Sequence, residues 1–211
     1  MRTAQSLAML QSRALTRVDR LRLLVATPTS GAALDRQTAF VVIEAHSLWA
    51  SFCRCFYLSC AYGARDSRGT RVLARPYRHG SEVDALTTAV HAVRPQLRGR
   101  SGPWQPRDEP AWANPVDFGR VVIALSPSNA SAVRTALAYS PRTLKHLTTF
   151  RNFYAHRGQA TAGKAQRLAS IYMLPANLHP TILLNSFSLT RPQVVLSDLL
   201  DDIRRTIELT N

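Results

Sequence analysis

One uninterrupted helical stretch does most to limit the folds open to this chain. Residues 33–62 contain neither proline nor glycine, and their large apolar side chains recur at helical spacing: Val41, Ile43, Leu48, Trp49, Phe52, Phe56 and Tyr57. Apolar residues three and four positions apart are typical of a helix that buries one face. Gly63, which follows directly, is a residue type that commonly ends helices. The sequence therefore predicts a long helix over 33–62.

Helical periodicity also runs through most of the remaining chain. It predicts further helices over residues 5–24, 81–93, 114–125, 129–138, 140–157, 164–174 and 190–209. Three of these starts carry capping residues, namely Ser81 with Asp84, Asn114 with Pro115, and Ser140 with Pro141. No alternating pattern long enough for a convincing strand occurs. The expected fold class is all-α, an antiparallel helical bundle with two long basic loops.

Length and composition suggest how the chain is organised. With 211 residues, 45% of them hydrophobic, we expect one globular domain over 1–211. Within it, residues 1–30 are a predicted N-terminal helical extension and residues 94–115 a long loop insertion. Arginines interrupt the apolar residues of the first helix, which is atypical of a signal peptide. We also see no apolar window of about 20 residues, and three cysteines make a poor disulfide inventory, so we expect a cytoplasmic protein without a membrane span.

The chain is strongly basic. It carries 27 Lys and Arg against 13 Asp and Glu, and all but Lys145 and Lys164 of the basic residues are arginine. A compositional bias could explain arginine over lysine, but not the net charge of +14. Residues 64–80 and 94–115 together hold nine arginines. Arginine binds phosphate with two parallel hydrogen bonds, so these loops are predicted to contact a polyanion. Trp104 and Trp112 in the second loop either stack on unpaired bases or anchor the loop.

The residues Arg151-Asn152-Phe153-Tyr154-Ala155-His156 carry the most informative motif. The segment resembles the Arg-Asn-x-x-x-His signature of the HEPN superfamily. Members of that superfamily are helical bundles, and many are metal-independent ribonucleases of toxin–antitoxin, abortive-infection and CRISPR-associated systems. The resemblance covers about residues 33–210 and is sharpest over 140–160. It implies an HEPN-like bundle, a homodimer whose two motif helices face one cleft, and an antitoxin or defence partner protein.

The motif residues suit RNA cleavage. Asn152 and His156 are four residues apart and share one helix face, whereas Arg151 lies about 140° away round the helix from His156. His156 is the predicted general acid and base, and Arg151 the predicted clamp on the phosphate. Asn152 would position His156 or a phosphate oxygen, and Arg157 would add a phosphate contact. The nucleophile would be the 2′-hydroxyl of the RNA, so the expected endoribonuclease (a hydrolase by class) needs neither metal nor cofactor.

Two alternatives to a ribonuclease remain open. The first is a non-catalytic HEPN module for RNA binding, dimerisation or adaptor contacts. The second is a structural helical protein that binds an acidic partner. In one HEPN subgroup a tyrosine lies two residues after the histidine and can be nucleotidylated. Gly158 occupies that position here, so we do not expect this regulation.

Glu44 and the cysteines are the remaining candidates. Glu44 lies inside the long apolar helix, either at its surface or as a buried partner that orients Arg151. Cys53 and Cys60 share a stripe with His46, but a spacing of seven residues is too long for one metal ion. Cys53, Cys55 and Cys60 are therefore predicted to be small core residues.

Overall fold

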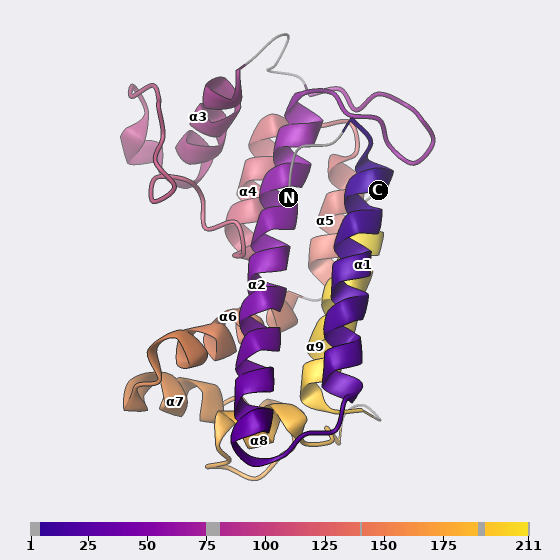
Figure 1. The fold of residues 1–211 in the computed structure, drawn as a ribbon. Helices are drawn as coiled ribbons and strands as arrows, with labels where there is room; N and C mark the ends of the chain where they lie inside the picture. The colour runs from indigo at the N-terminus through magenta and orange to yellow at the C-terminus, as the bar shows by residue number, and fades with distance from the viewer. Residues whose placement is uncertain (1–4, 75–80, 140, 190–192, 211) are drawn as a thin grey trace. The chain divides into compact units, whose positions relative to one another are not determined.

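The computed structural model describes residues 5–74, 81–139, 141–189 and 193–210. Over these residues the chain is helical, and its β structure is limited to isolated bridges, so the all-α prediction is confirmed (Figure 1). The longer helices are α1 (Leu7–Ala26), α2 (Gly31–Ala61), α3 (Glu82–Val93), α4 (Pro115–Leu125), α5 (Ala130–Tyr139), α6 (Pro141–His156) and α9 (Val195–Glu208). The shorter ones are η1 (Pro95–Leu97), α7 (Gln159–Gln166), η2 (Ala169–Tyr172) and α8 (Pro180–Asn185).

Contacts within the chain group into two compact units. Unit 1 consists of Met1–Ala14, Trp49–Tyr139 and Thr206–Asn211, and unit 2 of Leu15–Leu48 and Ser140–Arg205. Helices α1, α2 and α9 each contribute residues to both units. Leu7, Leu10 and Val18 of α1 are almost completely buried, so the predicted N-terminal helix contributes residues to the core. The expectation of one domain over the whole chain stays a prediction.

Unit 1 contains a cluster of large aromatic residues. Trp49 stacks on Phe52 at 5.9 Å between ring centroids, and Phe118 of α4 meets Trp49 edge-on at 6.2 Å. Helix α4 also contacts α3 and α5. Cys53, Cys55 and Cys60 are all buried and free, which confirms their prediction as core residues.

Unit 2 places α6 in contact with α7, and α7 in contact with α8. The core of the unit takes apolar residues from several helices: Val18, Leu21, Val41, Leu144, Leu147, Phe150, Leu183, Leu199 and Ile203. All residues of the predicted catalytic motif belong to unit 2.

Helix α2 modifies one expectation. It is long and apolar enough to cross a membrane by length and composition alone, although its sequence led us to expect no such segment. Half of the apolar stretch of α2 that passes this test of length and composition is buried inside the protein, and core helices of soluble proteins pass the same test. The helix is therefore weak evidence for a span.

The two predicted helix caps that lie within the described residues, at Ser81 and Asn114, are confirmed. Ser81 and Asp84 form a reciprocal capping box on α3, and the Asn114 side chain accepts a hydrogen bond from the Val116 N–H at the start of α4. The predicted cap at Ser140 and the start at residues 190–192 lie outside the described residues.

The segment after the motif helix differs from the prediction. In place of one helix over 164–174, the chain forms α7, η2 and then α8. Helix α8 has only six residues and begins with Pro180, and the His179 side chain accepts the Thr181 N–H as its cap. A helix this short carries too little periodicity for its sequence to reveal it.

Candidate functional site

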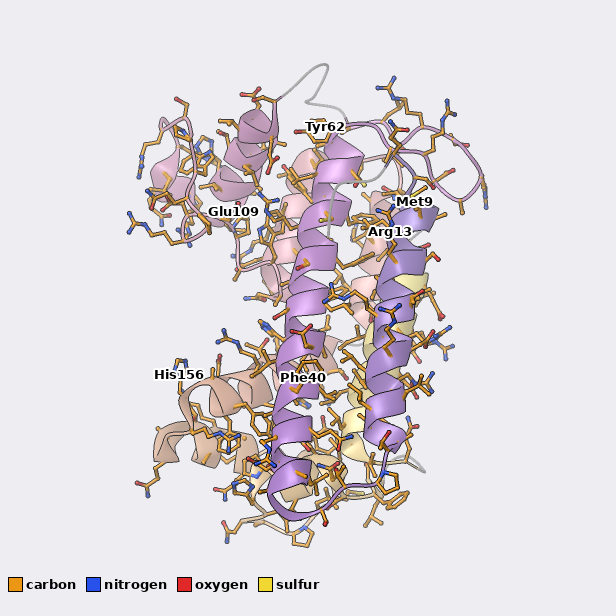
Figure 2. The ribbon with its side chains drawn as sticks, viewed as in Figure 1. Met9, Arg13, Phe40, Tyr62, Glu109 and His156 are labelled. Atoms are coloured by element: carbon orange, nitrogen blue, oxygen red, sulfur yellow. The ribbon has the colours of Figure 1, made fainter. Side chains whose placement is uncertain are left out.

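Helix α6 presents the motif residues by burying their neighbours. Phe150, Phe153 and Tyr154 are 5% exposed or less and anchor the helix in unit 2. Arg151 and Asn152 are half-buried, and His156 is exposed in the last turn. Figure 2 shows His156 at the end of α6. The helix thus continues through His156, which confirms that Asn152 and His156 lie four residues apart on one face.

Arg151 and Asn152 contact each other directly. A guanidinium N–H of Arg151 donates to the Asn152 side-chain oxygen at 3.3 Å. This bond links the arginine to the residue that shares a face with His156. The predicted Arg, Asn and His therefore come from adjacent turns of one helix.

His46 lies close enough to Arg151 for their charges to interact, which the sequence analysis did not predict. Burial, together with the positive charge of nearby Arg151, lowers the pKa of His46 to about 4. The imidazole is therefore neutral near pH 7, and this environment makes it a weak proton acceptor. The only sequence signal for it is a histidine inside the apolar stretch of 33–62, which was considered there only as a metal ligand.

Glu44 has a different partner from the one predicted. Its carboxylate pairs with Arg17 of α1 at 3.3 Å, with both side chains more than one third exposed. Glu44 therefore lies at the helix surface, the other alternative of the sequence analysis, and does not orient Arg151. The reason is that α1 runs beside this part of α2 and supplies an arginine there, which helical spacing along α2 cannot reveal.

Arg157 is also engaged within the chain. Its guanidinium pairs with Asp35 of α2 at 2.7 Å and lies 5.4 Å from the centre of the Tyr154 ring. Arg157 also adopts the left-handed backbone conformation, with φ at 45°. This conformation is unfavourable for a side chain other than glycine, so the contacts of Arg157 must stabilise it. The predicted phosphate contact of Arg157 would have to compete with Asp35.

Asp35 is the centre of a hydrogen-bond network that ties three helices together. It accepts hydrogen bonds from Arg157 and from the Thr181 hydroxyl of α8, and that hydroxyl lies 3.0 Å from the Tyr154 hydroxyl. Burial opposes ionisation of Asp35, but the bonds from Thr181 and Arg157 outweigh it and lower the pKa of the carboxyl. Burial also raises the pKa of Tyr154. The network fixes the last turn of α6, where His156 lies.

The two tryptophans of loop 94–115 anchor it. The indole N–H of Trp104 donates to the Thr87 hydroxyl at 2.7 Å, and that of Trp112 donates to Glu109 at 2.7 Å. Trp112 is only 8% exposed. Of the two interpretations offered by the sequence, the structure supports anchoring.

Metal clusters and cavities are the other kinds of site to consider. No group of three or more His, Cys, Asp or Glu side chains that could hold a metal ion occurs among the described residues. A cavity of about 10 Å³ lies in unit 2 between α1, α2, α8 and α9, and none of the motif residues lines it. That volume is close to the minimum for one water molecule, so the cavity is too small for a substrate.

No protein-family model, curated protein or solved structure matches the chain. The resemblance to the HEPN superfamily therefore stays a prediction that rests on the motif.

Proposed function

We propose that the chain is a metal-independent endoribonuclease of the HEPN type. The observation that carries the proposal is the exposed His156 on the same helix as the bonded pair of Arg151 and Asn152. An imidazole, a guanidinium and an amide are the groups that phosphodiester transesterification needs: a proton carrier, a cation for the phosphate and an orienting polar group.

The proposed step uses the RNA's own 2′-hydroxyl. The 2′-oxygen forms a bond to phosphorus while the bond from phosphorus to the 5′-oxygen breaks, which leaves a 2′,3′-cyclic phosphate and a 5′-hydroxyl. One proton leaves the 2′-hydroxyl and one is delivered to the 5′-oxygen. The exposed His156 is the proposed carrier of these protons. Arg151 would stabilise the charge that builds up on the phosphate oxygens.

The test is cleavage of end-labelled single-stranded RNA in excess EDTA by the full chain. Wild type should yield 2′,3′-cyclic phosphate ends and should leave DNA of the same sequence intact. His156→Ala should lower the rate by about 10²–10⁴-fold, the usual contribution of a general acid–base group. Lys145→Ala is the matched control, because Lys145 is an exposed basic residue of the same helix.

Three results would contradict the proposal. Equal cleavage by wild type and His156→Ala would remove His156 from the reaction. Loss of wild-type cleavage in EDTA would show that a metal ion is needed. Cleavage of DNA and RNA at the same rate would exclude the 2′-hydroxyl as nucleophile.

The second candidate is RNA binding without cleavage. It is favoured by the engagement of Arg157 with Asp35, which leaves one cation fewer for the phosphate. RNA retained at equal affinity by wild type and His156→Ala, with no product from either, would select this alternative. The remaining expectations, namely a homodimer, a toxin or defence role with a partner protein, and a cytoplasmic location, are supported by the resemblance and composition alone.

A further inference from the structure

Loop 94–109 of unit 1 is fastened to helix α3. Thr87, His91 and Arg94 are spaced by four and then three residues, so they form one stripe along and just beyond this helix. Thr87 accepts the Trp104 indole N–H at 2.7 Å, and a ring nitrogen of His91 lies 3.0 Å from the Arg100 carbonyl. The Arg94 guanidinium donates to the Arg107 carbonyl at 3.1 Å. A loop that its sequence predicts to be structureless is thus attached at three points.

The same loop leaves its other guanidinium groups exposed. Arg98, Arg100 and Arg107 are all exposed, and none of them forms an ion pair with a carboxylate of the described residues. The two acidic residues of the loop have other partners: Glu109 bonds Arg54 and Trp112, and Asp108 accepts the Gln105 N–H. The Arg100 guanidinium lies 5.7 Å from the centre of the Trp104 ring. Three positive charges therefore face solvent on a loop of defined conformation.

The other basic loop is different over its described residues, 64–74. The Arg65 guanidinium donates to the Gly69 carbonyl of its own turn at 2.7 Å. Asp66 accepts the N–H groups of Arg68 and Thr70 and closes that turn. The side chain of Arg65 and the only carboxylate of this segment, that of Asp66, are thus used in its own turn, so we take loop 94–109 as the better candidate for an outside partner.

We propose that loop 94–109 binds the phosphate backbone of single-stranded RNA through Arg98, Arg100 and Arg107. Guanidinium groups match phosphate oxygens in geometry and charge, and a loop that is already ordered loses little entropy on binding. Trp104 acts as an anchor here, because Thr87 occupies its N–H and Arg100 lies over its ring. The choice of RNA as the polyanion rests on the proposed function, but binding by the loop does not require that α6 cleaves RNA.

The test measures binding of labelled single-stranded RNA over a range of salt concentrations, in full-length His156→Ala protein so that cleavage cannot interfere. One variant changes Arg98, Arg100 and Arg107 to Gln. The matched control changes Arg13, Arg20 and Arg134 to Gln. These three arginines are also exposed, so the control loses the same number of positive charges as the loop variant. The loop variant should bind RNA roughly 10-fold more weakly or worse. The slope of its log K against log salt should become shallower by about 2, because each phosphate that is no longer neutralised contributes about 0.7. The control should keep the slope of the parent.

A second variant tests the conformation of the loop without changing its charge. Thr87→Val removes the hydroxyl that binds Trp104 and leaves all arginines in place, and it should weaken RNA binding severalfold. Thermal denaturation of every variant checks that the chain still folds.

Several outcomes would overturn the proposal. Equal weakening in the two triple variants would mean that net charge alone drives binding. Unchanged binding by the loop variant would exclude the loop. Full binding by Thr87→Val would show that the fastened conformation is irrelevant. A loop variant that no longer binds polyglutamate but still binds RNA would identify an acidic protein as the partner instead.

Discussion

Arg157 at the end of α6 and Arg98 in loop 94–109 are both exposed arginines, yet their surroundings differ. Arg157 pairs with Asp35 and lies against two aromatic rings, Phe153 and Tyr154. Arg98 forms no ion pair within the described part of the chain, because its loop is fastened through backbone carbonyls, an indole and a hydroxyl. At the end of α6 the arginine contributes to the packing of the structure. In loop 94–109 other groups hold the loop in place, and the arginine stays exposed.

This difference suggests how a chain with 25 arginines divides their roles. Carboxylates are scarce, 13 in all, so most guanidinium groups cannot find one. Where a carboxylate is half-buried beside a helix end, as Asp35 is, the pair fixes a turn. Where the loop carboxylate already pairs with an arginine outside the loop, as Glu109 does with Arg54, the exposed guanidinium groups of the loop stay available for a phosphate.

The largest expected effect concerns Arg151. Arg151→Ala should lower RNA cleavage by about 10²–10³-fold, as expected when a charge-stabilising donor is removed. Arg151→Lys should recover only part of the rate, because lysine lacks the planar fork. Arg142→Ala, an exposed arginine at the other end of α6, is the control and should cleave normally. The readout is the single-turnover rate, and equal rates for Arg151→Ala and Arg142→Ala would refute the clamp.

A smaller effect compares the two regions through their aspartates. Asp35→Asn weakens the acceptor for Arg157 and Thr181 and should lower the free energy of unfolding by about 1–3 kcal/mol. Asp108→Asn alters only an exposed bond to the Gln105 N–H and should stay within about 0.5 kcal/mol of wild type. Urea denaturation measures both. Equal destabilisation would show that the bonds of Asp35 at the end of α6 contribute no more to stability than the bond of Asp108 in the loop.

The smallest effect is the pH dependence contributed by His46. Its folded pKa of about 4 lies below the usual value of 6.5, so the unfolded chain binds this proton more readily than the folded chain. The associated stability is complete above pH 6.5 and is lost as the pH falls towards 4. His46→Gln should therefore flatten the decrease in stability between pH 6.5 and 4, measured against its own value at pH 8. An unchanged slope would show that His46 is not buried beside Arg151.

Much of the fold could be predicted because its signals are local. The long helix over 33–62 was expected from its spacing and occurs as α2, Gly31–Ala61. The caps at Ser81 and Asn114 depend on residues two or three positions away, and the structure confirms both. Helix α8 was missed because six residues give no usable period. The grouping of contacts into two compact units depends on contacts between distant segments, which local sequence signals do not show.

The candidate site shows the same limit more sharply. The sequence placed Arg151, Asn152 and His156 on one helix, and that needed only spacing. It offered Arg151 as a partner for Glu44, whereas the partner is Arg17, 27 residues away. It offered Arg157 as an added phosphate contact, but it could not reveal that Asp35, 122 residues away, binds the guanidinium. The low pKa of His46 was not predicted, because it comes from burial and from Arg151 on another helix.

By itself, then, the sequence determined the helical class, most helix starts and the order of the motif residues along α6, because hydrogen bonds and caps within a helix involve near neighbours. Tertiary structure alone decided which charges are neutralised and which remain free. The partner of a long side chain depends on which helix packs beside it, and that packing joins residues far apart in the chain. The fixed last turn of α6 and the exposed arginines of loop 94–109 both follow from such packing.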